Sequence, residues 1–466
     1  PVNLLSVLFG LVTAWTSPTI YLLQSPDTPL TDGPMSNDEV SLMTSIMYLS
    51  AIFGSLIAGS LANNIGRKWT IFVGAIPQVV AFILIFFAHQ IIHIFISRCF
   101  SGLAIGIATV IIPIFVTEIA DKDLRGTLGN FMAVAISIGN LLGKLLPILG
   151  GFYLTPIVVC TVLAIFSPIA VLFPDTPQFL LLQNREEEAE TSLRFYRGVS
   201  GESTSDEGLK LEFEELKKSP SLIKQEMKLH FRDFCGGATI LAIICSFWLS
   251  NHIAWTGNRV FVSYTDTLLR MAQTVEDVPL MDISVSAIQV VISVITVFLI
   301  KYFGNRWVLI ISFLLTFIAL VFIGAHFLFI EMGYGVSDYT WPFSTAFIIG
   351  TVIPGSSISS QSYSVAAEIL PPKLRGFLLS IYLIVSWLLG FVFLNYFFQL
   401  QDSLGISGWM WIFAAWCLFS LFMSSFFLPD TRKKNFDDIL EIFNKKLPHK
   451  WRQNIPGLPV IYNTRL

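Results

Sequence analysis

Long apolar runs recur along the whole chain, and short polar or Gly- and Pro-containing turns separate them. A run of about 20 apolar residues is long enough to cross the hydrocarbon core of a bilayer as a helix. Because backbone groups in lipid need internal hydrogen bonds, each run is expected to be α-helical. The pattern predicts an all-α polytopic membrane protein with twelve spans, at 4–24, 41–62, 70–88, 91–119, 126–149, 153–173, 236–260, 283–302, 306–330, 341–366, 375–399 and 408–428.

The longest polar stretch separates six of these spans from the other six. It holds two segments of helical periodicity around a Ser/Gly/acidic linker, which we expect to form short helices on the cytoplasmic face. The predicted parts are an N-terminal six-helix bundle at 1–174, a cytoplasmic helical linker at 175–233, a C-terminal six-helix bundle at 234–428 and a cytoplasmic tail at 429–466.

Charged turns stand at matching places in the two halves, which predicts two pseudo-symmetric bundles. Glu118 precedes an Arg-Gly pair by seven residues, and Glu368 does the same in the second half. Ion pairs between the bundles could form a cytoplasmic gate that opens repeatedly, since exposed pairs contribute only about 0–1 kcal/mol each. Alternatively, the cations only set orientation, although the paired glutamates are not needed for that. The candidate gate residues are Arg67, Glu118, Arg125, Arg306, Glu368 and Arg375.

Lysine and arginine are concentrated in one set of turns and in the polar stretch at 175–233. The loop at 25–40 has four acidic residues and no cation, and the predicted loop at 263–282 has Arg270 alone against four acidic residues. Cationic loops stay in the cytoplasm. Both termini are therefore expected to face the cytoplasm, and the lipid bilayer is the expected surrounding medium.

The composition narrows the function further. The chain is 54% hydrophobic and 13% charged, with a net charge of −3, so no basic surface points to nucleic acid. The five cysteines contain no CxxC pair and are expected to be small buried hydrophobes. No phosphate-binding loop, metal-ligand cluster or nucleophile arrangement is present. We expect no enzyme activity, no cofactor and no metal site.

Several motifs in order carry a family resemblance. They include Gly66-Arg67-Lys68, Glu118 before Arg125-Gly126, the segment PDTPQFLL at 174–181 and the segment PDTRKKNFDDI at 429–439. With them the chain resembles the sugar porter family of the major facilitator superfamily over essentially its whole length. The first span and the segment after it look most like the insect facilitated trehalose transporter group.

The resemblance implies facilitative transport of a sugar, trehalose or a hexose, by alternating access, in the plasma membrane. It also implies that the charged turns close the cytoplasmic gate in the outward-open state. Sugars are bound by amides, hydroxyls and aromatic faces. By resemblance, or as polar groups nearby, the candidate solute-binding residues are Gln289, Tyr363, Trp387, Ser386, Ser137 and Asn251.

Other positions depart from the family pattern. Ala133, Phe247 and Trp248 stand where the family has glutamines. The alternatives are therefore a proton-coupled or non-sugar carrier, or a non-transporting relative that acts as a ligand-binding sensor. A neutral His252 is favoured over a proton-coupling one, and Leu11 stands where proton-coupled members carry an aspartate.

Two cations within predicted spans need separate explanations. Arg98 is expected near the outer end of the fourth span, where it could help to close an outer gate. Lys144, in the fifth span, either extends to the outer surface or faces an aqueous cavity. The sequence favours neither reading.

Overall fold

The computed structural model describes residues 3–120, 125–198, 207–226, 234, 236–336, 340–431 and 436–446, and among these residues it has helices and no strand. The N-terminal helices are α1 (Asn3–Ala14), α2 (Thr16–Leu23), α3 (Asn37–Ile65), α4 (Arg67–Phe86), α5 (Ile91–Ile119) and α6 (Arg125–Leu172). Three helices follow: α7 (Pro177–Leu182), α8 (Glu186–Arg197) and α9 (Glu207–Glu226). The C-terminal helices are α10 (Gly237–Ser250), α11 (His252–Trp255), α12 (Asn258–Met271), α13 (Val278–Phe303), α14 (Asn305–Glu331), α15 (Thr340–Ile353), the π-helical η3 (Pro354–Ile358), α16 (Ser359–Ile369), α17 (Pro372–Asn395), α18 (Phe397–Phe426) and α19 (Phe436–Lys446).

The number of membrane spans agrees with the apolar pattern. Within the described ranges, ten helices are long and apolar enough to cross a membrane, and the broken pair 237–250 and 252–271, bent by 43°, makes eleven. Dividing α6 at Gly150 and Gly151, where its dihedral angles are not helical, adds one more and gives twelve. The predicted all-α polytopic membrane fold is confirmed.

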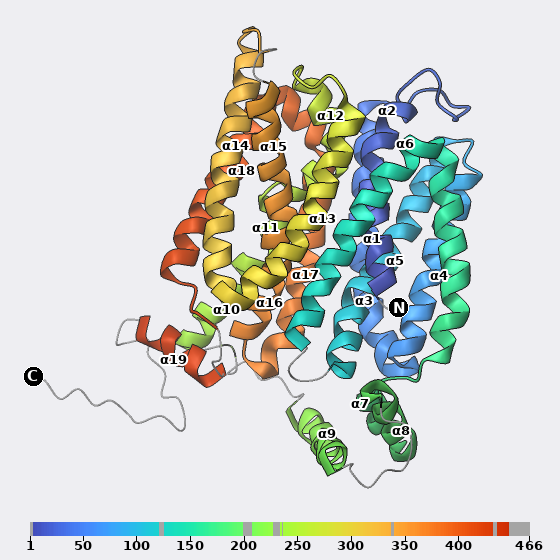
Figure 1. Ribbon diagram of the computed structural model, residues 1–466, viewed down its shortest axis with the longest axis vertical. Coiled ribbons are helices and arrows are strands. Elements are labelled where there is room, and N and C mark those ends of the chain that lie inside the picture. The colour runs from blue at the N-terminus through green and yellow to red at the C-terminus, as the bar shows by residue number, and fades with distance from the viewer. Residues whose placement is uncertain are drawn as a thin grey trace, which may run out of the picture.

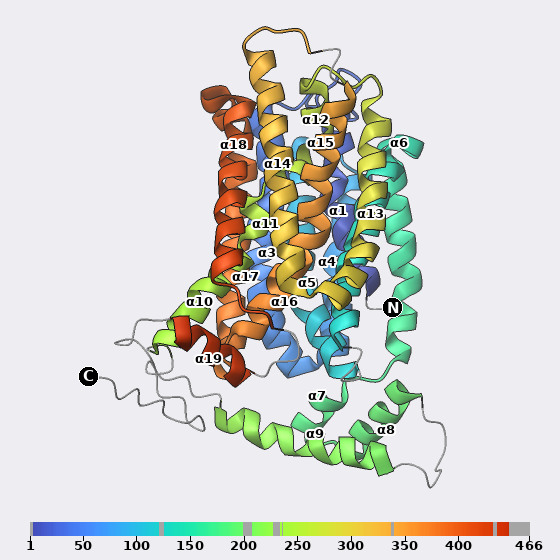
Figure 2. The same cartoon turned by 60° about the vertical axis from the view of Figure 1, so that its left-hand side comes forward.

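The spans form two bundles side by side, α1–α6 in blue to teal and α10–α18 in green to red (Figure 1). Helices α7, α8 and α9 lie beyond one end of the spans, and α9 lies crosswise to the direction of the spans (Figure 2). We call this end, which also carries α19, the linker face. The opposite end, with the connections 24–36 and 272–277, is the loop face. Large apolar side chains such as Phe53 and Phe298, 59% and 57% exposed, cover the outer surface, as lipid contact requires.

Backbone contact at glycines holds two helix pairs of the N-terminal bundle together, α3 with α5 and α1 with α6. A Cβ at Gly102 of α5 would come within 2.1 Å of the Met47 carbonyl oxygen of α3. A Cβ at Gly139 of α6 would come within 1.9 Å of the Val7 carbonyl oxygen of α1. Without water-driven association in lipid, such close packing is a main source of helix–helix affinity.

The two halves repeat the same backbone turn. Gly66, between α3 and α4, has φ 96° and ψ 166°, and Gly304, between α13 and α14, has φ 80° and ψ 160°. Only glycine adopts these angles at little cost. The matching turns support the predicted pseudo-symmetry of the bundles.

The seventh span differs from its prediction. It continues past a break at Gly257 (φ 75°) into α12, so the expected loop at 263–282 shrinks to 272–277. The reason is that α12 buries an apolar face, with Phe261 and Leu268 fully buried. Asp282 consequently lies within α13 and is buried rather than in a loop.

The glycine contacts give a direct test. Gly102→Val places two methyl groups where the α3 backbone lies, and overpacking of this kind costs about 1–3 kcal/mol or more. We expect a strongly reduced yield of monodisperse protein in detergent, measured by size-exclusion chromatography. The matched control is Gly59→Val on α3, because a Cβ at Gly59 meets nothing within 4 Å. Equal yields of the two variants would contradict this account of the packing.

Candidate functional site

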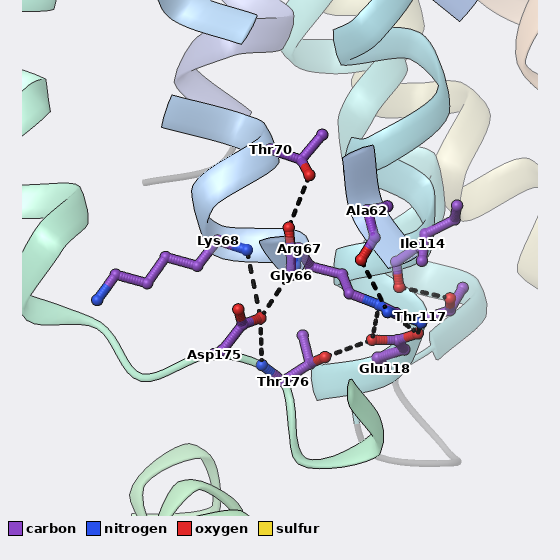
Figure 3. A network of polar contacts seen from close by, with 10 residues as sticks. All are labelled: Ala62, Gly66, Arg67, Lys68, Thr70, Ile114, Thr117, Glu118, Asp175 and Thr176. Carbon is purple, nitrogen blue, oxygen red and sulfur yellow. Dashed lines mark hydrogen bonds and ion pairs between the residues drawn. The ribbon is translucent and has the colours of Figure 1, made fainter. Parts of the chain in front are cut away.

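A buried ion pair marks the linker face of the N-terminal half. Arg67, at the start of α4, donates from Nη2 and Nε to Glu118 at the end of α5, at 2.9–3.1 Å (Figure 3). Both side chains are 8% exposed. Nη1 of Arg67 also donates to the Ala62 carbonyl at 3.1 Å, and the Thr176 hydroxyl donates to Glu118. The guanidinium therefore connects α3, α4 and α5.

The PDTPQFLL segment completes this site from the other side. Asp175 Oδ1 accepts from the backbone N–H groups of Arg67, Lys68 and Thr176 at 2.8–3.3 Å. Burial raises the pKa of the Asp175 carboxyl, and these donors oppose the shift. A Cβ at Gly66 would come within 2.1 Å of Asp175 Oδ2, so the carboxylate fits here only because residue 66 is glycine.

The corresponding cations of the C-terminal half contact backbone carbonyls. Arg306 donates from Nη2 to Ser425 at 2.6 Å, and Arg375 donates to Leu370 at 3.3 Å. Glu368 accepts from the Ser364 hydroxyl at 3.4 Å. The sequence allowed ion pairs between the bundles, whereas in this structure Arg67 pairs with Glu118 inside one bundle. The side chain of Arg125 lies outside the described part of the chain.

A second cluster lies between the halves, near the middle of the spans. The Arg259 guanidinium of α12 lies over the rings of Tyr48 and Trp387, at 4.8 and 4.7 Å from their centroids. It donates to the carbonyl and hydroxyl oxygens of Ser386 at 2.8 and 2.9 Å. The Trp387 indole donates to Ser55 of the other half at 3.2 Å. Ser386 and Trp387, two of the predicted solute-binding residues, therefore belong to a stack of aromatic rings and a guanidinium that contacts the opposite bundle.

Other predicted site residues surround this stack. Tyr363 lies close to Ser386 and Arg259. Gln289 is 4% exposed, and its amide lies against Gly355, where a Cβ would come within 2.5 Å of Nε2.

Ser137 meets the opposite half directly. Its hydroxyl is 2.7 Å from that of Ser293 across the interface between the halves. Predicted site residues of four helices, α6, α13, α16 and α17, are thus placed along that interface or close to it.

Asn251 and His252 face a different environment. Asn251 donates from Nδ2 to the Phe247 carbonyl of its own helix at 2.8 Å. His252 packs among Trp248, Phe313 and Trp416, and its Nδ1 accepts from the Trp416 indole at 3.1 Å. Since an indole N–H only donates, Nδ1 carries no proton. The ring is therefore neutral here, within the C-terminal bundle.

Sequence reasoning missed Arg259, Tyr48 and Ser293. It placed the polar positions of the seventh span at 247–253, but Phe247 is 43% exposed and its ring packs against Tyr382. The available signal was Gly257 with Arg259 two residues later, a helix break with a cation inside an apolar region. A Cβ at Gly390 would come within 2.0 Å of Arg259 Nη1, so Gly390 makes room for the cation.

The remaining polar contacts between the halves lie at the loop face. Lys144 pairs with Asp282 at 2.5 Å, Thr44 and Tyr264 share a hydrogen bond of 2.6 Å, and Ser45 donates to Asn395 at 3.1 Å. The hydrogen bonds and ion pairs named above that join the halves run from the loop face to just past the middle of α3. Among the described residues, these polar contacts join the halves at the loop face and at mid-depth.

Arg98 also lies toward the loop face, but its hydrogen bonds go to groups of the N-terminal half. It is 1% exposed and donates to the Val12 carbonyl at 3.1 Å and to the Thr16 hydroxyl at 2.9 Å. It thereby satisfies polar groups at the break between α1 and α2.

Two pseudo-symmetric six-helix bundles with polar groups between them, closed at one face, define a secondary transporter of the membrane. The family model described as "Sugar (and other) transporter" matches residues 1–443. The chain belongs to this family, which confirms the resemblance seen in its motifs.

Similar proteins and solved structures of similar fold are also transporters. The facilitated trehalose transporter Tret1 of Polypedilum vanderplanki is 27% identical, with 94% of this chain and 86% of that protein covered. Tret1 of Anopheles gambiae is also 27% identical, over 94% of this chain and 54% of that longer protein. The inward-open xylose transporter XylE from E. coli is similar in fold, with a TM-score of 0.73 at 19% identity over 95% of this chain and 98% of that one.

The linker-face ion pair predicts a stability effect. Glu118→Gln leaves the Arg67 cation buried without its carboxylate, and breaking a buried pair costs about 3–5 kcal/mol. We expect the melting temperature in detergent to fall by several degrees, measured by size-exclusion chromatography after heating. Glu187→Gln, an equivalent change at an exposed position of α8, should leave it unchanged. Identical melting temperatures for both variants would show that the pair adds no stability.

Proposed function

We propose that this protein is a facilitative carrier that moves a sugar, trehalose or a hexose, down its gradient by alternating access. The observation that carries this proposal is the interface between the halves, which gathers aromatic, hydroxyl and amide groups at mid-depth while the loop face is closed. Membership of the sugar transporter family and the names of the trehalose-transporting relatives support it.

The orientation proposed is linker face inward. The polar segments of that face hold most of the cations, and the loop-face connections are acidic, which favours a cytoplasmic linker face. Both termini then lie in the cytoplasm, and the membrane is the plasma membrane. With the loop face closed, this conformation is proposed to be inward-facing.

The moving parts are the two bundles, with 1–174 and 234–428 rocking about the solute and 175–233 and 429–466 covering the cytoplasmic side. Within the N-terminal bundle, glycines bring the backbones of α3 and α5 and of α1 and α6 into direct contact. Contacts between the bundles are side-chain hydrogen bonds, ion pairs and ring contacts. Side chains exchange partners readily, so the interface between bundles is the part that can separate.

The proposed solute site consists of Trp387, Ser386, Tyr363, Gln289 and Ser137, joined by Arg259. An indole face suits the apolar face of a sugar ring, and the amide and hydroxyls suit its hydroxyl groups. Asn251 remains a proposed solute-binding residue, because its Nδ2 bonds to its own helix while its buried Oδ1 is left to accept from a solute.

The cytoplasmic gate is proposed to form from the charged turns when the bundles close on the linker side. Arg67 and Glu118 would then serve as a fixed pair inside one bundle. Arg125, Arg306, Glu368 and Arg375 are the remaining gate candidates. Coupling to protons is not part of the proposal, because His252 accepts a hydrogen bond as a neutral ring and Leu11 offers no carboxylate.

Uptake by proteoliposomes tests the function. We expect saturable uptake of labelled trehalose or glucose that does not change when a proton gradient is imposed. Gradient-dependent uptake would replace the facilitator with a symporter. Binding of either sugar without uptake would favour a non-transporting sensor. Absence of both would exclude these sugars as the solute.

The site itself is tested at Trp387. Trp387→Ala removes the aromatic face, and aromatic contacts are worth about 0.5–1.5 kcal/mol beyond burial, so we expect a rise in KM of about two- to tenfold. Trp387→Phe keeps a ring and should lie closer to the wild type. Trp307→Ala, at a 55% exposed position, is the matched control. A KM unchanged in Trp387→Ala would remove this residue from the site.

A further inference from the structure

A buried ion pair between the two bundles lies close to the loop face. Nζ of Lys144, on α6, is 2.5 Å from Oδ1 of Asp282, on α13, and the two side chains are 3% and 1% exposed. Nζ also donates to the Thr265 hydroxyl at 3.1 Å, and the Ser17 hydroxyl donates to Asp282 Oδ2 at 3.1 Å. Both charges are therefore surrounded by partners from both halves.

The surroundings balance the charge of the pair. Asp266 also lies within electrostatic range of Lys144 and Asp282. Its carboxylate accepts from Arg270 at 2.7 Å, and its backbone N–H donates to Ser17 at 3.0 Å. Arg270 in turn lies over the Tyr21 ring at 3.9 Å from the centroid. Two cations and two carboxylates thus form a neutral network that joins α2 and α6 to α12 and α13.

We propose that the Lys144–Asp282 pair is the lock of the loop face, and that it sets the balance between the two facing states. The proposal rests on alternating access but not on the identity of the solute. It assigns a transport role to Asp282, to which the sequence gave none, and to Lys144, for which the sequence left two alternatives.

The physical argument concerns water. Two charges in an apolar surrounding are stable only as a pair, because each would lose its hydration without compensation. If the bundles separate at the loop face, water enters and hydrates both charges, so the pair can open there at moderate cost. If one charge of the pair is removed, the remaining charge is buried without a partner in the closed state, whereas water hydrates it in the open state. Single neutralisations must therefore favour the open loop face.

The experiment measures access to the loop face directly. Ser45→Cys is introduced into the full-length chain with its five native cysteines replaced by alanine. Ser45 is fully buried and bonded to Asn395 of the other half, so a membrane-impermeant maleimide reaches it only when the halves separate. The rate of modification in proteoliposomes then reports the open state without any solute.

The expected result separates the pair from a general loss of charge. In Asp282→Asn and in Lys144→Met the modification rate should rise at least about tenfold, because an unpaired buried charge is strongly unfavourable. In the double variant, which buries no unpaired charge but also lacks the ion pair between the halves, the rate should lie below that of the single variants and above that of the reference. Asp38→Asn, which removes an exposed carboxylate on the same face, is the matched control and should show no change.

Two outcomes would overturn the proposal: single variants modified at the reference rate, or a double variant modified as fast as the single ones. A second readout covers variants that are poorly folded. A disulfide between Ser45→Cys and Asn395→Cys forms across the closed loop face, and its yield should fall in the single variants and recover in the double variant. If proteoliposomes take up neither sugar yet these shifts appear, the proposed solute is wrong and the lock stands.

Discussion

The rest of this structure depends on one constraint: polar groups within the membrane-spanning part must find partners in the protein. The backbone meets it by forming helices, which explains why the described chain contains no strand. Side chains meet it by gathering where helices from different bundles face each other. Lys144, Asp282, Ser137 and Arg259 all lie at such places and are almost completely buried.

The two kinds of helix contact have different consequences. Glycine lets backbones touch, as at Gly102 and Gly139, and such contacts have no alternative partner to exchange with. Hydroxyl, indole and charged groups between the bundles can be rehydrated or paired anew. A structure with rigid contacts within bundles and exchangeable ones between them is suited to rocking as two bodies. The Arg67–Glu118 pair belongs to the rigid part, because it connects helices of one bundle and is further held by the Thr176 hydroxyl.

Sequence reasoning succeeded where the signal was local. Span number and the positions of the charged turns follow from runs of apolar residues and from single glycines. It failed in the seventh span, because a break at Gly257 followed by an amphipathic helix looks like the end of a span and a loop. That error removed Asp282 from the buried region and hid its pairing with Lys144, which lies 138 residues away.

The amino-acid sequence alone determined that this is a twelve-span helical membrane protein of two related halves, and the family to which its motifs belong. These properties depend on local hydrophobicity and on short motifs, both of which are read along one chain segment at a time. The tertiary structure decided that Lys144 faces Asp282, that Arg259 lies between Tyr48 and Trp387, and that the loop face is the closed one. Those facts depend on which helix faces meet across the interface between the halves. A pairing between side chains of distant segments produces no periodic pattern in the sequence.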